Sequence, residues 1–213
     1  MSLISRGLIA TFFVISIYLS LGIEKVHADQ FVNGAEKFIT SLAAKAETAL
    51  LTENISPIEH QKRFRKLMLD SFDLNGVGKW VIGRYWRRTP ESERTRYLEL
   101  FEKFIVATYS KRFRGYTKAK LKINSATKRK TAVYVSSQIN REGAKPIRIV
   151  WRVKSLNGDY KITDIIIEGI SWIQTQRSEF ISVIRNNGGK LSGLINALRK
   201  KITYLTSVKK KSN

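Results

Sequence analysis

The chain has no cysteine, and only two histidines and three prolines among its 213 residues. Without cysteine it can form neither a disulfide bond nor a thiolate metal site. One histidine, His60, lies between Glu59 and Gln61 in a polar stretch, without metal-ligand spacing, and is predicted to lie on the surface. The sequence also lacks a GxSxG nucleophile motif, a P-loop and an HExxH motif. These absences predict a protein that is not an enzyme and that uses no metal or cofactor.

Long apolar runs are also absent, except at the start of the chain. Residues 1–28 combine Arg6, an apolar run from Leu8 to Ile23, and small residues at a cleavage site ending at Ala28. The run is shorter than the roughly 20 residues that a membrane-spanning helix needs. We therefore expect a cleaved signal peptide and an exported protein, with an uncleaved anchor as the alternative.

Acidic residues are scarce, since 17 Asp and Glu face 39 Lys and Arg, for a formal net charge of +22. This excess favours anionic partners, either lipid surfaces or nucleic acid. An exported protein meets lipid headgroups far more often than DNA, so an anionic membrane surface is the expected partner and nucleic acid is not. A solvated basic face without any specific partner is the remaining interpretation.

The rest of the chain is predicted to form one domain, residues 29–202, followed by a basic tail, residues 203–213. Helical spacing of apolar residues marks the first half, and Pro57 and Pro90 stand where a proline can begin a helix. The predicted helices cover residues 29–51, 57–72, 77–82 and 90–113.

After Tyr116 the period changes to two, which indicates β-strands. Asn157-Gly158 is typical of a type I′ hairpin turn, because both residues tolerate a positive φ. Two helices at residues 177–187 and 190–202 close the domain. The pattern predicts an α+β fold, an antiparallel β-meander sheet packed against several helices. The predicted strands are residues 121–126, 131–140, 146–156 and 160–168.

The last predicted strand carries two carboxylates, Asp164 and Glu168, on one face. They could form a catalytic pair, but arginine is so abundant that structural ion pairs are the favoured interpretation. In the same strand Ile165 is predicted to point to the face opposite Ile162. Aromatic residues exceed the needs of a small core, which leaves an ordinary core and a ligand cavity both open.

Three blocks carry a family resemblance. They are GKWVIGRYWR at residues 78–87, TYSKRF at residues 108–113, and the stretch from Tyr160 to Phe180 that begins YKITDIIIEGIS. Their order and spacing resemble the MlaC family, the periplasmic phospholipid-binding component of the maintenance-of-lipid-asymmetry system, also called toluene-tolerance proteins. A hopanoid-associated relative of that family is a variant of the same interpretation.

The resemblance implies that sheet and helices enclose an apolar cavity for phospholipid acyl chains, with the headgroup near solvent. It implies a periplasmic carrier that works as a monomer. Such a carrier would pass lipid between an outer-membrane lipoprotein complex and the inner-membrane complex of an ABC transporter.

Candidate site residues follow from this expectation together with face and period. Arg84, Arg87 and Arg112 are the expected phosphate-side contacts, because guanidinium groups pair with phosphate oxygens in a bidentate manner. The candidate residues that line the cavity are Trp80, Val81, Tyr85, Phe101, Phe104, Ile105, Tyr109, Val135, Ile149, Trp151, Ile165 and Ile167.

Two other classes of function stay open from the sequence alone. One is a small hydrolase or isomerase with Asp164 or Glu168 as its base. The other is a basic secreted module that binds anionic membrane surfaces or nucleic acid without a lipid cavity.

Overall fold

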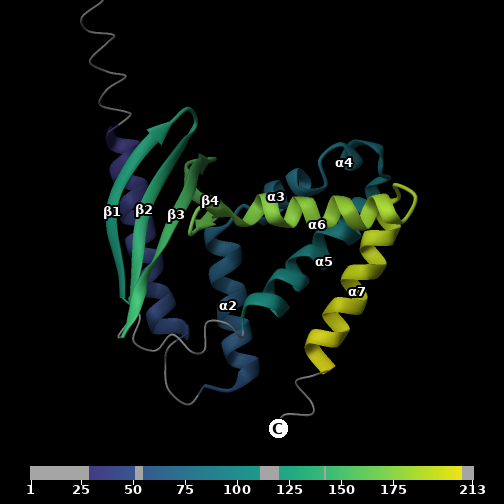
Figure 1. The fold of residues 1–213 in the computed structure, drawn as a ribbon, viewed down its shortest axis with the longest axis horizontal. Helices are drawn as coiled ribbons and strands as arrows, with labels where there is room; N and C mark the ends of the chain where they lie inside the picture. The colour runs from purple at the N-terminus through teal and green to yellow at the C-terminus, as the bar shows by residue number, and fades with distance from the viewer. Residues whose placement is uncertain (1–28, 51–54, 111–119, 142, 208–213) are drawn as a thin grey trace, which may run out of the picture.

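The computed structural model describes residues 29–50, 55–110, 120–141 and 143–207 (Figure 1). The predicted signal peptide, Arg112 and the end of the predicted tail beyond Ser207 lie outside these ranges. None of the described helices is both long and apolar enough to cross a membrane. The helices are the N-terminal helix (residues 29–50), α2 (Pro57–Ser71), α3 (Leu74–Ile82), α4 (Arg84–Arg88), α5 (Glu91–Tyr109), α6 (Trp172–Asn186) and α7 (Leu191–Ser207).

The strands form one antiparallel sheet in chain order, which confirms the predicted α+β fold with a β-meander. The turn between the last two long strands is made by Asn157 and Gly158, with φ of 53° and 90°, as the type I′ prediction requires. The strands are β1 (Lys120–Arg129), β2 (Ala132–Arg141), β3 (Ala144–Leu156), β4 (Asp159–Ile167) and β5 (Ile170–Ser171).

The N-terminal helix packs along one face of the sheet, here called the core face. Ala35 and Ile39 of the helix are buried against Val133, Val153 and Ile162 of the strands. Near the start of the helix, the ring of Tyr160 stacks between Phe31 and Phe38 at centroid distances of 5.8 and 6.0 Å. Gly34 permits this approach, because a Cβ there would lie 1.9 Å from the Tyr160 hydroxyl oxygen.

The prediction that Ile162 and Ile165 point to opposite faces of the last strand is wrong. Val153 pairs with Ile162 and Trp151 pairs with Ile165, while the register shifts between Arg152 and Val153. The shift is a β-bulge, which adds one residue to β4 and so reverses the alternation of its side chains. Ile162 and Ile165 therefore both join the apolar cluster on the core face.

The remaining helices form a second layer beside the β4 edge of the sheet (Figure 1). Helix α6 begins at Trp172, five residues before the predicted start at Arg177, because Ser171 caps it by accepting a hydrogen bond from the Gln174 amide. Helix α7 continues past Ile202 to Ser207. Apolar side chains from α3 to α7 surround Phe101, Ile105 and Ile184 to form the core of this layer.

The packing of this helical core can be tested by removing the hydroxyl of Tyr97. Tyr97 is fully buried and donates a 2.9 Å hydrogen bond to the Gly78 carbonyl oxygen. We expect Tyr97→Phe to lower the free energy of unfolding by about 1–2 kcal/mol in urea titrations, because the buried carbonyl loses its partner. Tyr204→Phe, at an exposed site, is the control and should change little.

The pH dependence of unfolding supplies a second readout of the same residue. Burial raises the pKa of Tyr97 well above its ordinary value. The neutral phenol therefore stabilises the fold below the unfolded-state pKa of about 10, and this stabilisation is lost as the pH rises beyond it. The wild-type protein should lose more stability than Tyr97→Phe above that pH, and equal losses would contradict the assignment.

Candidate functional site

The core face of the sheet carries apolar side chains in rows that cross the strands. One of these rows begins at Ile170, which is 67% exposed, and passes through Ile167, 45% exposed, to Ile149, 6% exposed. An apolar surface thus continues from solvent at the β5 edge into the buried sheet. The next two rows along the strands are Ile165, Trp151 and Val135, then Ile162, Val153 and Val133.

Trp151 presents an apolar ring in the middle of this face. Its indole Nε1 donates a 2.8 Å hydrogen bond to Ser137 Oγ, and that hydroxyl donates to the Ile149 carbonyl oxygen at 3.2 Å. The polar atom of the indole is therefore satisfied within the sheet. The half-buried ring remains free for apolar contacts.

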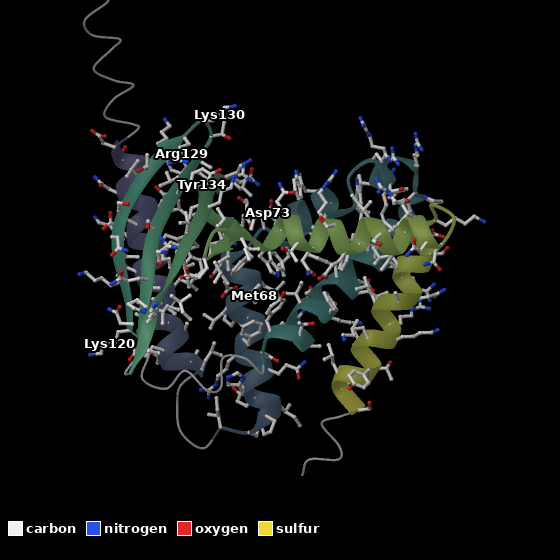
Figure 2. All side chains as sticks on the ribbon, in the orientation of Figure 1. Met68, Asp73, Lys120, Arg129, Lys130 and Tyr134 are labelled. Atoms are coloured by element: carbon white, nitrogen blue, oxygen red, sulfur yellow. The ribbon has the colours of Figure 1, made fainter. Side chains whose placement is uncertain are left out.

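A second aromatic group lies where the sheet meets the helical layer. Trp172 Nε1 donates a 2.7 Å hydrogen bond to the Tyr109 hydroxyl, and the two rings meet edge to face at 6.0 Å. Trp172 directly follows Ser171, which pairs with Ile166 of β4, so this ring pair stands at the β4–β5 edge. Met68 packs against two apolar clusters, as Tyr109 also does, and Figure 2 labels it on α2 in the middle of the molecule.

The predicted lining residues on the helices divide between the core and its border. Val81, Phe101 and Ile105 are 0–1% exposed, so protein atoms already surround them on every side. Tyr85 is also buried in this helical cluster, while Phe104 and Tyr109 are half-buried at its border. The lining prediction as a whole stays a prediction, but Val81, Phe101 and Ile105 have no free surface in this conformation.

Trp80 lies apart from the other predicted lining residues, on the surface of α3. It is 41% exposed. The Arg177 guanidinium lies over its ring at 4.7 Å from the centroid and also donates a hydrogen bond to its carbonyl oxygen. This contact ties α6 to α3.

The two described headgroup candidates, Arg84 and Arg87, are exposed on α4, at the end of the helical layer away from the sheet (Figure 1). The Arg84 guanidinium lies 5.3 Å from the centroid of the Tyr85 ring. Together with Arg185 it lowers the pKa of the Tyr85 hydroxyl below its usual value. The third candidate, Arg112, lies outside the described residues.

The two carboxylates of the predicted last strand have separate structural contacts. Asp164 is buried, and its two oxygens accept hydrogen bonds from Ser171 Oγ at 2.6 Å and from the Ile173 amide at 3.0 Å. It caps α6, and among the described residues it forms no ion pair of the kind predicted, because the bulge and the β5 turn direct it to the helix start. Glu168 lies beyond β4, with φ of 48°.

Glu168 does form the predicted pair with arginine. It accepts hydrogen bonds from the Arg148 amide at 2.5 Å and from Arg148 Nη2 at 3.3 Å. These hydrogen bonds lower the pKa of the Glu168 carboxyl. The contact therefore stabilises the fold above the ordinary carboxyl pKa and is lost as the pH falls.

A surface cleft of about 310 Å³ lies between the α2–α3 junction, α5 and the β3–β4 hairpin, and it includes Phe72, Asp73 and Lys161. Figure 2 labels Asp73 near the β4 end of α6. The cleft includes none of the predicted lining residues. Within the described residues, no cluster of histidine, aspartate and glutamate could hold a metal ion.

Sequence reasoning did not include the half-buried Trp172 and Met68 among the candidate site residues, and it placed His60 on the surface. His60 is 3% exposed, not a surface residue, because it lies one turn before Phe64 on the buried side of α2. That four-residue spacing was a usable signal. Thr108, beside Tyr109, has a buried hydroxyl that finds no hydrogen-bond partner in the described parts of the chain.

Comparison with solved structures defines the class of the fold. The chain superposes on the phospholipid-binding protein from Ralstonia solanacearum, solved in complex with a phospholipid, with a TM-score of 0.74 and 17% identity; the match covers 81% of this chain and 98% of that one. The MlaC protein family model matches residues 37–200. This chain therefore belongs to the MlaC family, as its three sequence blocks predict.

A curated relative matches the chain over part of its length. The intermembrane phospholipid transport system binding protein MlaC of Haemophilus influenzae is 22% identical over 129 residues, which is 58% of this chain. The match spans 60% of the length of that relative.

The cap formed by Asp164 provides a test of its structural role. We expect Asp164→Ala to lower the free energy of unfolding by about 1–2 kcal/mol, because the Ile173 amide and the Ser171 hydroxyl lose their acceptor. Asp164→Asn, which keeps one acceptor oxygen, should lose less. Asp159→Ala is the control, because Asp159 is exposed. A stability unchanged by Asp164→Ala in urea titrations would contradict this role.

Proposed function

We propose that this protein is a phospholipid carrier that moves lipid between the outer and inner membranes as the soluble component of an ABC-type transport system. Its place of work is the periplasm, reached by export and removal of residues 1–28. Its partners are the outer-membrane lipoprotein complex and the inner-membrane transporter complex. It acts without catalysis and as a monomer.

The observation that carries this proposal is the apolar surface of the sheet. The row from Ile170 through Ile167 to Ile149 passes from exposed to buried, so it offers an acyl chain a continuous apolar path into the protein. Membership in the MlaC family and the phospholipid bound to the Ralstonia solanacearum neighbour support the same assignment.

The acyl chains would lie between the core face and the helical layer, bordered by Trp151 on the sheet and by the Trp172–Tyr109 pair and Met68 on the other side. These side chains are half-buried and belong to the borders of the three apolar clusters. Because borders between clusters are packed by fewer fixed contacts than cluster centres, they can separate at a smaller cost. The hydroxyl of Thr108, which has no hydrogen-bond partner among the described residues, would offer a hydrogen bond to the ester region.

A carrier is needed because phospholipid chains are costly to expose to water. A two-chain lipid exposes on the order of 30 methylenes, which at ~0.8 kcal/mol each amounts to roughly 25 kcal/mol. Only a protein that covers the chains throughout the transfer removes this barrier. A flat basic surface would bind headgroups but would leave the chains in the membrane.

The first experiment is native mass spectrometry with lipid extraction on protein purified from the periplasm without detergent. We expect one bound phospholipid per chain, and its fragmentation would identify the headgroup. Protein that carries no lipid and takes none from vesicles would overturn the carrier proposal. A bound hopanoid in place of phospholipid would overturn the ligand assignment.

Charge placed in the proposed chain site should remove the lipid. We expect Trp151→Glu and Trp172→Glu to lower the lipid-bound fraction in native mass spectra by more than about tenfold, because a carboxylate would be buried beside hydrocarbon. Tyr204→Glu places the same charge at an exposed aromatic on α7 and should leave the bound fraction unchanged.

Circular dichroism and urea titrations would establish that each variant is folded before the lipid is measured. If a folded Trp172→Glu variant retained lipid as the control does, the site at the β4–β5 edge would be wrong. Trp172→Leu, which keeps an apolar side chain, should retain lipid and would separate the effect of charge from the loss of the Tyr109 hydrogen bond.

A further inference from the structure

Two isoleucines stand exposed side by side at one end of the sheet. Ile167 of β4 pairs with Ile170 of β5, and the two side chains are 45% and 67% exposed. Glu168 and Gly169 make the turn between them, with φ of 48° and 83°, so the two isoleucines flank a short hairpin loop. An adjacent exposed pair of large aliphatic side chains differs from scattered single ones, because it presents a contiguous apolar area that water covers at a cost.

Basic residues occupy the opposite face of the same end of the sheet. Lys122 and Arg148 flank Gln138 in one cross-strand row, directly beside the row that contains Ile149 and Ile167. Lys120 precedes Lys122 on the same face of β1 and is exposed. Lys145 of β3 is exposed as well and lies on the side of Ile147 and Ile149. Figure 2 labels Lys120 at the end of the sheet opposite Arg129 and Lys130.

This end of the sheet carries an excess of positive charge. Glu168 is the one carboxylate among the described residues beside these rows, and its bond to Arg148 offsets a single charge. The row that contains Ile149 and Ile167 crosses five strands, which at about 4.8 Å spacing make it roughly 20 Å wide. The sheet end therefore combines an apolar loop with a band of cations across a width of several lipid headgroups.

We propose that this end of the sheet, defined by Ile167, Ile170, Lys120, Lys122, Lys145 and Arg148, docks directly on the surface of an anionic phospholipid bilayer. The cations would meet lipid phosphates while the isoleucine loop enters the interface, the combination by which peripheral proteins hold a membrane. The inference rests on the proposed function and deepens it. Docking by this end would bring the exposed start of the apolar row to the membrane from which a chain must enter.

Vesicle co-sedimentation of the purified full-length protein tests the docking surface. We expect binding to vesicles that contain phosphatidylglycerol in phosphatidylcholine, weakening as salt rises, and much weaker binding to pure phosphatidylcholine. Lys120→Glu with Lys122→Glu should weaken binding by more than about tenfold, since each basic residue near an anionic surface is worth about a fivefold change. Ile167→Thr with Ile170→Thr should weaken it several-fold even at high salt, because Thr keeps the β-branched shape and removes apolar area.

The controls carry the same changes elsewhere on the surface. Lys62→Glu with Lys103→Glu makes the same change in net charge on α2 and α5, and Ile58→Thr alters an isoleucine that is 79% exposed on α2. Both controls should bind nearly as the wild type does. If the control variants weakened vesicle binding as much as the test variants do, the cause would be net charge or general hydrophobicity. That result would overturn the assigned docking surface.

Lipid retention, measured by native mass spectrometry on the wild type, separates this inference from the proposed function. A protein that carries lipid but binds no vesicles, or that binds only a membrane-protein partner, would overturn the docking surface and leave the carrier assignment intact. A protein that binds anionic vesicles but neither carries nor extracts lipid would overturn the carrier assignment instead.

Discussion

The rest of the structure depends on the carboxylate of Asp164, which joins the sheet to the helical layer. Its oxygens hold Ser171 and the Ile173 amide, so the chain that leaves β4 must reverse at once and enter α6. A buried carboxylate is costly without such donors, and the helix start supplies them with a favourable dipole. The position of α6 beside the sheet edge follows from this contact, and the position of Trp172 follows from α6.

The consequence of this junction is a protein with separate apolar clusters instead of one continuous core. One cluster joins the N-terminal helix to the sheet, a second fills the helical layer, and a third lies between the N-terminal helix, α2 and α5. Centres of these clusters are closed, as the complete burial of Val81, Ile105 and Val153 indicates. Trp151, Tyr109 and Met68 lie at the borders, so a hydrocarbon guest could separate the layers without breaking a cluster centre.

Sequence patterns predicted the α+β class, the meander, the Asn157-Gly158 turn and most helix positions, because periodicity and turn chemistry are local properties. They failed where a tertiary contact overrode the local pattern. The bulge in β4 reversed the predicted side-chain directions, and an early cap moved the start of α6 by five residues. The candidate site stays a prediction, because spacing on a helix shows which side chains share a face but not whether that face meets a ligand or another helix. Phe101 and Ile105 pack against other helices in this conformation.

Charge and apolar surface address two different steps of the transfer that a lipid carrier performs. Cations attract the protein to an anionic membrane over a distance of about a Debye length, but they bind phosphates that remain in the bilayer. An apolar path acts only at contact, since a chain must leave one hydrocarbon environment for another without crossing water. One end of this sheet carries both the cations and the apolar side chains, because consecutive residues of a strand point to opposite faces. Lys122 and Ile123 on β1 are such neighbours, as are Arg148 and Ile149 on β3. If the protein acts as proposed, the period of two in an ordinary β-strand places the cations that attract the membrane within one residue of the apolar row that a lipid chain enters.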